Sequence, residues 1–428
     1  MNIASNEARC TSCHSGYGWK DNNFDFTNEQ KVDCLVCHEQ SREYKKFPTD
    51  AGYPALEDKY FGDELYKKVD LNKSAQSVGL PTRHNCGACH FYGGGGDGVK
   101  HGDLDSSLID PPYDLDVHMS KDGGDFSCAR CHTTVDHKIA GRCYKTPAFT
   151  DRKSVLDSDM VKRISCVSCH TDSPHKNVKK LNDHTDKVSC QACHIPAFAR
   201  QNPTKMQWDW STAGDLKDGK PYVEMDEEMQ RIKYSSQKGD FTWEKNVEPE
   251  YFWYNGSLEY VLLTDEIDPS NSPIKLNCVM GDMNDEKSRI YPFKVHKAKQ
   301  PYDKINNKMA AVHLYGKNNT SYWSNFHWGN AIQTAMDYMD LPYSGEYEFI
   351  DTEYHFQITH MVAPAKDSLT CVQCHSPNGR LEKLAGFYMP GRDKFGLIDK
   401  GGFALIFLSL GVVFVHGLIR IFSSSKKD

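Results

Sequence analysis

Seven copies of one short motif constrain this chain of 428 residues more than any other feature. The motif is Cys-x-x-Cys-His, and it accounts for all but two of the 16 cysteines. Two thiols three positions apart can add to the two vinyl groups of one haem, and the next residue then offers its imidazole to the iron. We therefore predict covalent haem c at each copy, with the histidine as the proximal ligand. The predicted attachment residues are Cys10, Cys13 and His14; Cys34, Cys37 and His38; Cys86, Cys89 and His90; Cys128, Cys131 and His132; Cys166, Cys169 and His170; Cys190, Cys193 and His194; and Cys371, Cys374 and His375.

Other uses of paired cysteines fit this pattern less well. Zinc ribbons, thioredoxin-like redox sites and secreted disulfide frameworks all contain closely spaced cysteines, but none requires a histidine after every second one. The two remaining cysteines are Cys143 and Cys278. Either they pair with each other, or they stay reduced and buried as small apolar groups.

The density of the motifs predicts the fold class. Six of the seven lie before residue 195, and so short a stretch cannot build a separate hydrophobic core around each. We expect the porphyrins to supply the apolar interior, with the polypeptide wrapped around them as short helices and loops. The prediction is a mainly α fold with extensive irregular loops, a multihaem cytochrome c core and one C-terminal transmembrane helix.

The chain is expected to divide into parts of different composition. Residues 1–200 form the haem-dense part, and residues 366–400 hold the last motif and a linker. Residues 201–365 carry no motif but are rich in Trp and Tyr, which we expect to pack on porphyrin faces and on one another. Within that segment, helices are predicted near 325–340 and 346–362.

The formal net charge is −7, and haem propionates make the protein more negative still. A strongly negative protein repels polyanions, so nucleic acid is excluded as a partner.

The histidines outside the motifs are numerous enough to give most haems a second imidazole. Such closed, six-coordinate irons suit electron relay. Two stretches, CHTTVDHK and CHTDSPHK, look like one local unit used twice, with a histidine five residues after the proximal one. For any single histidine the alternative is a surface or hydrogen-bonded side chain. The predicted second ligands are His118, His137, His175, His184, His296 and His360.

A glycine-rich run from Phe91 to Asp105 is a further candidate site. Its spacing approaches that of a phosphate-binding loop, but Val99 stands where that motif requires lysine. Glycines let the backbone approach a flat ligand closely. Lys100 and His101 point in opposite directions in an extended chain, so each could reach a different haem. A lysine amine binds iron only when it is deprotonated, which burial favours. The alternative is a solvated lysine on a loop.

The C-terminal segment is predicted to anchor the protein in a membrane. Residues 401–422 are mostly apolar and as a helix would span about 33 Å, against a hydrocarbon core of about 30 Å. The tail 423–428 contains two lysines, and positive flanks favour the cytoplasm. The remainder is then expected on the periplasmic face of the inner membrane. His416 lies within the span and either contacts another helix or binds a haem.

Haem attachment takes place outside the cytoplasm, so an export signal is expected. Residues 1–9 contain no apolar run. We expect that Met1 is an internal methionine and that a further segment precedes it.

Several stretches resemble the octahaem tetrathionate reductase family of c-type cytochromes. They include NEARCTSCHSGYGWKDNNFDFT, NCGACHFYGGGGDGVKHGDLDSSL, CQACHIPAFAR and YPFKVHKAKQPYD. The resemblance covers roughly residues 1–398. It implies a periplasmic oxidoreductase that reduces tetrathionate, and also nitrite or hydroxylamine, with an eighth haem attached upstream of residue 1.

The resemblance also implies roles for particular residues. The family's catalytic haem matches the 10–14 motif, and Lys100 is the candidate for its lysine ligand. A cysteine close to that haem is expected upstream of residue 1. Asp97, His101 and Asp103 flank Lys100 and are candidates for proton donation.

Two functions remain open from the sequence. The first is a reductase of a small sulfur or nitrogen oxyanion, supplied with electrons by a membrane quinol-oxidising cytochrome. The second is a non-catalytic conduit that passes electrons from the quinol pool to another reductase. A homo-oligomer is compatible with either function.

Overall fold

The computed structural model describes residues 8–21, 23–139, 164–316 and 319–424. The chain divides into two compact units, of which the first extends to Ser368 and the second begins at Leu369. Cys143 lies outside the described residues, so the predictions made for it stay open.

Each of the first six motifs forms about one turn of helix. A single turn places residues i and i+3 on the same side, so the two thiols face one haem. Caps fix where these turns begin: Asp33 accepts hydrogen bonds from the amides of Leu35 and Val36, and Ser189 accepts one from that of Ala192. The helical elements of the first unit are η2 Cys10–Cys13, η3 Glu29–Lys31, α1 Cys34–His38, α2 Leu71–Gln76, α3 Arg83–His90, η4 Ser106–Ile109, α4 Cys128–Cys131, α7 Val167–His170, α8 Lys180–Asp183, η5 His184–Asp186, α9 Cys190–His194, η6 Trp210–Thr212, η7 Pro269–Asn271, α10 Tyr322–Asn325, α11 Trp328–Tyr338 and η8 Ala365–Asp367.

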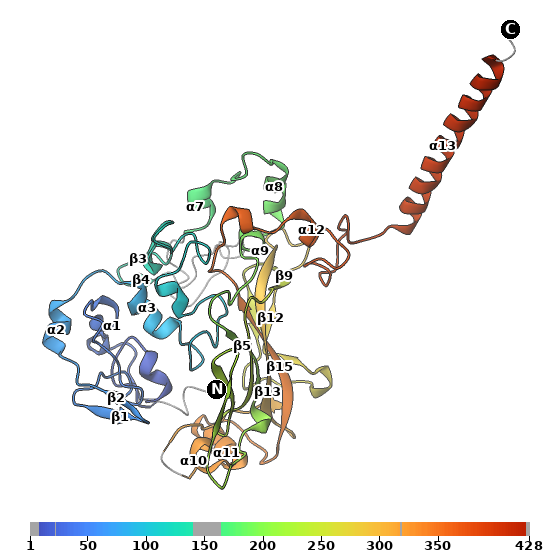
Figure 1. Ribbon diagram of the computed structural model, residues 1–428. Helices are drawn as coiled ribbons and strands as arrows, with labels where there is room; N and C mark the ends of the chain where they lie inside the picture. The colour runs from blue at the N-terminus through green and yellow to red at the C-terminus, as the bar shows by residue number, and fades with distance from the viewer. Residues whose placement is uncertain (1–7, 22, 140–163, 317–318, 425–428) are drawn as a thin grey trace. The chain divides into compact units, whose positions relative to one another are not determined.

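A nine-stranded sheet dominates the second half of this unit (Figure 1). Its main path runs in the order β11-β15-β13-β5-β8-β7-β6, and β14 and β9 both pair with β13. The longest strand, β13, pairs antiparallel with β15 over eleven residue pairs, from Phe293–Gln357 to Asp303–Tyr347. The strands are β5 Thr204–Asp209, β6 Val223–Asp226, β7 Arg231–Ser235, β8 Gly239–Glu244, β9 Glu250–Tyr254, β11 Ile274–Lys275, β13 Arg289–Asp303, β14 Lys308–Met309 and β15 Tyr347–Gln357.

Three small hairpins lie outside this sheet. They pair β1 Lys59–Phe61 with β2 Glu64–Tyr66, β3 Thr134–Val135 with β4 Lys138–Ile139, and β10 Leu258–Tyr260 with β12 Asn277–Val279. Asp136 and His137 form the two-residue turn of the second hairpin, and both have positive φ. This turn fixes the position of His137.

The predicted mainly α fold class is wrong. Helix makes up 27% and strand 21%, with a large mixed sheet. The helix predicted near 346–362 is also wrong, because most of that segment forms β15. The reason is that burial along β15 does not alternate cleanly, so the segment lacks the regular alternation that identifies a half-buried strand. The helix predicted near 325–340 is present as α11.

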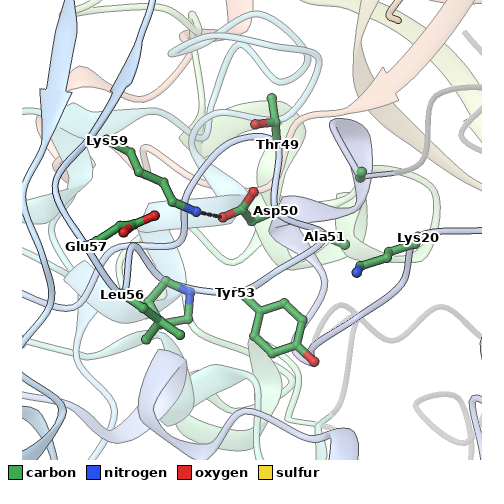
Figure 2. A pocket seen from close by; sticks show the side chains of 10 residues that line it. Lys20, Thr49, Asp50, Ala51, Tyr53, Leu56, Glu57 and Lys59 are labelled. Atoms are coloured by element: carbon green, nitrogen blue, oxygen red, sulfur yellow. Dashed lines mark hydrogen bonds and ion pairs between the residues drawn. The ribbon is translucent and has the colours of Figure 1, made fainter.

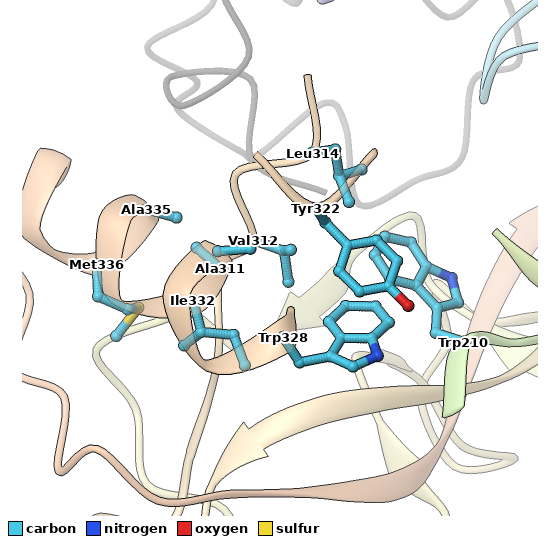
Figure 3. Close-up of a cluster of buried hydrophobic side chains, with 10 residues drawn as sticks. Trp210, Ala311, Val312, Leu314, Tyr322, Trp328, Ile332, Ala335 and Met336 are labelled. Atoms are coloured by element: carbon cyan, nitrogen blue, oxygen red, sulfur yellow. The ribbon is translucent and has the colours of Figure 1, made fainter. Parts of the chain in front are cut away.

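The aromatic residues between the motifs build a core of their own. Tyr322 stacks on Trp328 with ring centres 3.9 Å apart, and Trp210 lies 6.0 Å from Trp328 (Figure 3). Ile332 and Met336 of α11 close the cluster and are fully buried. These aromatics therefore pack on one another, which is one of the two kinds of contact predicted for them.

The second unit contains the last motif in α12 Cys371–Cys374 and a long helix, α13 Gly396–Ser424. Thr370 and Gln373 form a capping box at the start of α12. The candidate span Gly396–Ser423 of α13 includes residues 401–422, and its 18-residue window has a mean hydropathy of 2.3 with none of it buried. By length and composition this helix could cross a membrane.

Candidate haem and catalytic site

The attachment thiols of different motifs lie next to one another. Three thiol pairs are within hydrogen-bonding range: Cys13 with Cys89, Cys86 with Cys128, and Cys166 with Cys190. The 10–14 motif therefore adjoins the 86–90 motif, which in turn adjoins the 128–132 motif. The 166–170 and 190–194 motifs adjoin in the same way.

Four proximal histidines each face a second histidine from elsewhere in the chain. The ring centres are 6.2 Å apart for His38 and His137, 5.9 Å for His170 and His118, 6.4 Å for His132 and His360, and 6.2 Å for His194 and His175. Two imidazoles on opposite sides of one iron have centres about 6 Å apart, since each metal–nitrogen bond is about 2 Å and the ring centre lies about 1 Å further. The residues present therefore fit haem with two histidine ligands.

The pairing crosses between motifs. His137 follows the 128–132 motif in sequence but faces His38, and His175 follows the 166–170 motif but faces His194. The local unit seen twice in the sequence thus places its extra histidine against a neighbouring motif. This arrangement connects motifs that are separate in sequence through the pairs His38–His137 and His194–His175.

Hydrogen bonds on Nδ1 fix the orientation of several of these rings. Nδ1 of His38 contacts the carbonyl oxygen of Gly79 at 2.9 Å, and Nδ1 of His175 contacts Oδ1 of Asn182 at 3.0 Å. A hydrogen bond from Nδ1 leaves Nε2 as the nitrogen available to the metal.

Two other predicted ligands lie in different surroundings. Nδ1 of His184 contacts the carbonyl oxygen of Lys180 at 3.0 Å, one helical turn earlier. Nδ1 of His296, on β13, contacts the carbonyl oxygen of Lys205 on β5 at 3.1 Å. Burial lowers the pKa of His296 to about 3, so its ring is neutral, as a metal ligand must be.

Four basic side chains gather around one aromatic ring, that of Phe356 on β15. The Lys100 and Lys294 Nζ atoms lie 5.8 and 5.9 Å from its centre. The rings of His101 and His296 approach its edge or face, with centres 5.4 and 6.5 Å away. The structure thus brings together the predicted catalytic residues Lys100 and His101 and the predicted ligand His296. We call these four side chains the Phe356 cluster.

Burial shapes the chemistry of the cluster. Lys100 is exposed, yet partial desolvation of its amine lowers its pKa; burial lowers the pKa of His101 to about 4. Lys294 is fully buried and donates hydrogen bonds to the carbonyl oxygens of Val99 and Lys100, at 3.1 and 3.2 Å, and to Oγ1 of Thr204 at 2.6 Å. Burial lowers its pKa to about 7. The two imidazoles are therefore neutral near pH 7, and the lysines are the groups of the cluster that can carry positive charge toward an anionic ligand.

The electrostatic surroundings of the first and third motifs differ. Burial and then the charge of Lys100 lower the pKa of His90. Burial and then the charge of Lys46 lower the pKa of His14. Lys100 therefore acts on the 86–90 motif, which adjoins the 10–14 motif through Cys89 and Cys13.

The two predicted acidic residues are placed differently. Asp97 accepts hydrogen bonds from Ser106 and lies 3.7 Å from the Arg231 guanidinium. Asp103 is buried and contacts Nδ1 of His360 at 3.1 Å. Burial would raise the pKa of Asp103, but the hydrogen bond from His360, the charge of His360 and the amide of Thr359 together outweigh it and hold that pKa at about 2.

A second buried lysine, which the sequence did not suggest, lies beside the cluster. The Nζ of Lys205 is 3.4 Å from the ring centre of Phe241, 4.2 Å from that of Trp208 and 5.2 Å from that of Trp243. Burial, with the charges of Lys238 and Lys294, lowers its pKa to about 6. The three aromatic rings around Lys205 come from β5 and β8, so this contact could have been predicted only by predicting those strands.

An open cavity of about 580 Å³ lies away from these residues (Figure 2). Its lining includes Tyr53 and an ion pair between Lys59 and Asp50 with atoms 2.7 Å apart. No attachment or predicted ligand residue lines it. It therefore has no part in the haem site as described.

Comparison with known proteins agrees with the geometry. Residues 113–204 match the family "Cytochrome c7 and related cytochrome c", and residues 205–378 match "Cytochrome c bacterial". A crystal structure of octahaem cytochrome c from Shewanella oneidensis is similar over 92% of this chain and 84% of its own, with 45% identity and a TM-score of 0.79. The chain belongs to the octahaem cytochrome c family. No curated protein matches it.

As a member of the octahaem cytochrome c family, the protein binds haem c covalently and is a multihaem redox protein of electron transfer. The predicted cofactor is thus confirmed. Bound haem supplies one-electron chemistry at iron, while the chain supplies the axial ligands and their hydrogen bonds.

Proposed function

We propose that this octahaem cytochrome c family member is a reductase of small oxyanions or related compounds of sulfur or nitrogen, such as tetrathionate, nitrite or hydroxylamine. The observation that carries the proposal is the Phe356 cluster. Lys100, Lys294, His101 and His296 place basic nitrogens around one ring, next to motifs whose thiols adjoin. Such groups stabilise the negative charge that develops when an oxyanion or an S–S bond is reduced.

Lys100 is the proposed ligand that substrate displaces or approaches. Partial desolvation lowers its pKa and so favours the neutral amine that an iron ligand requires. An amine is more easily displaced than an imidazole, so one site can open while the histidine-paired sites stay closed. His101 is proposed to hold or move protons beside it, whereas Asp103, with a pKa of about 2, stays ionised and contacts His360.

The proposed cellular setting is the outer face of the cytoplasmic membrane. The support is the exposed apolar helix α13, together with the extracytoplasmic placement typical of c-type cytochromes. A membrane quinol-oxidising cytochrome is the proposed electron donor.

The experiment compares the wild type with Lys100→Ala and with Lys121→Ala as a matched control. Lys121 is exposed and pairs with Asp110. Turnover of tetrathionate, nitrite and hydroxylamine is measured with a reduced dye as the electron donor, and binding of nitrite or cyanide is followed in the haem spectrum. We expect Lys100→Ala to lower turnover by about 10²-fold and to alter the spectrum of one haem. Lys121→Ala is expected to match the wild type.

The second candidate function is an electron conduit, which the four closed histidine pairs favour. A conduit would show uniform low-spin haems that do not bind added nitrite or cyanide. That spectrum in the wild type, together with an unchanged Lys100→Ala variant, would refute the reductase.

A further inference from the structure

Asp103 joins the glycine-rich run to the segment that follows β15. Its Oδ2 accepts hydrogen bonds from the backbone amides of Thr359 and His360 at 2.7 and 2.9 Å. The same oxygen lies 3.1 Å from Nδ1 of His360. The Asp103 side chain is 1% exposed, so solvent does not screen this contact.

The residue bound to Nδ1 differs among the paired histidines. His38 donates to a main-chain carbonyl and His175 lies against an amide. His360 instead lies against a carboxylate, and the hydroxyl of Thr359 is at the same distance of 3.1 Å. A carboxylate draws the Nδ1 proton toward itself and makes the other nitrogen a stronger electron donor to a metal. Stronger donation stabilises the oxidised iron relative to the reduced iron, which lowers the reduction potential.

Charges on neighbouring elements do not cancel this contact. The basic groups facing Asp103 are Lys294 from β13 and His101 from the glycine-rich run, and the His101 ring is neutral near pH 7 because its pKa is about 4. Neither is hydrogen-bonded to Asp103, whose other oxygen, Oδ1, is buried without a hydrogen-bond partner among the described residues. The bond to His360 is therefore the direct route by which this carboxylate acts on a ring that faces His132.

We propose that Asp103 is a positioning residue that, through His360, lowers the reduction potential of the haem of the 128–132 motif. The 128–132 motif adjoins the 86–90 motif at Cys128 and Cys86, and Lys100 lies near the latter. The carboxylate thus favours moving electrons off this haem toward the adjoining motif. This role is independent of which substrate is reduced.

The test is Asp103→Asn, which keeps the shape and removes the charge. We expect the midpoint potential of one haem to rise, in a redox titration followed by electron paramagnetic resonance. We expect the ratio of oxidised to reduced iron at a given potential to change about tenfold, which corresponds to a rise of about 59 mV for one electron.

Two further variants make the result specific. Asn182→Asp places a carboxylate on Nδ1 of His175 and should lower the potential of the 190–194 haem. Asp105→Asn is the matched control, because Asp105 is a buried aspartate that accepts hydrogen bonds from the amide of Ser107 and the side chain of Asn202. It is expected to lower stability and leave the potentials in place.

Unchanged potentials in Asp103→Asn with full haem content would overturn the proposal. If that variant does not fold, Asn182→Asp decides, and an unchanged 190–194 potential would likewise overturn it. Potentials are measured without substrate, so failure of the proposed reductase activity leaves this test intact.

Discussion

The Lys46 ammonium lies 3.4 Å from the Asp33 carboxylate, and both side chains are buried. Asp33 caps the helix of the 34–38 motif and also accepts hydrogen bonds from Tyr17 and Tyr44. Lys46 donates to the carbonyl oxygen of His14 at 2.6 Å. One ion pair thus joins two haem motifs that are separate in sequence.

Replacing Lys46 by Met should destabilise this joint. The substitution leaves the buried Asp33 charge without its cation, which typically costs about 3–5 kcal/mol of unfolding free energy. Denaturant unfolding followed by haem absorbance measures the loss. The matched control is Lys73→Met, since Lys73 pairs with Glu43 on the surface and should show no measurable change. Equal stability of the two variants would contradict a stabilising role for the Lys46–Asp33 ion pair.

Asp303 makes stability depend on pH. Burial would raise its pKa, but hydrogen bonds from Ser344 and Asn306 outweigh it, so the pKa lies below its usual value. Its contribution is therefore complete above the unfolded pKa of about 3.9 and is lost as pH falls through the lower folded value. Asp303→Asn should cost about 1–3 kcal/mol at neutral pH, because buried donors lose their acceptor.

The same variant tests the direction in which stability changes with pH. The stability difference between wild type and Asp303→Asn should shrink as the pH falls below about 4, measured by denaturant unfolding. Asp340→Asn, at an exposed turn, is the control. A difference that stays constant across this range would show that the Asp303 charge is not involved.

Deleting residues 396–428 should release the protein from membranes. The helix exposes large apolar side chains such as Leu405, Phe407 and Val413, at 68–70% of their surface. We expect the truncated cytochrome to fractionate without detergent and to keep its haem spectrum. Retention of the truncated protein in the membrane fraction would argue against α13 as the anchor.

The haem sites could be predicted from the sequence because their chemistry depends on local spacing. Cys-x-x-Cys-His determines attachment wherever it occurs, and each of the first six copies forms about one helical turn. The facing histidines could be proposed only as a set. His132 and His360 are 228 positions apart, and no local pattern connects them.

The sheet was missed for a different reason. β8 alternates buried and exposed residues, but β13 and β15, which form the centre of the sheet, do not alternate cleanly. With the strands unpredicted, the meeting of Lys205 with Phe241 and of Lys100 with Phe356 could not be foreseen. Both contacts depend on which strands are neighbours.

The adjacency of thiols from different motifs has a consequence for biogenesis. In the fold, Cys13 lies beside Cys89 and Cys166 beside Cys190. In an oxidising compartment, neighbouring thiols readily form disulfides, and such a crosslink would block both attachment reactions at once. Haem attachment at these motifs therefore requires that each of these thiols stay reduced until its own haem is added.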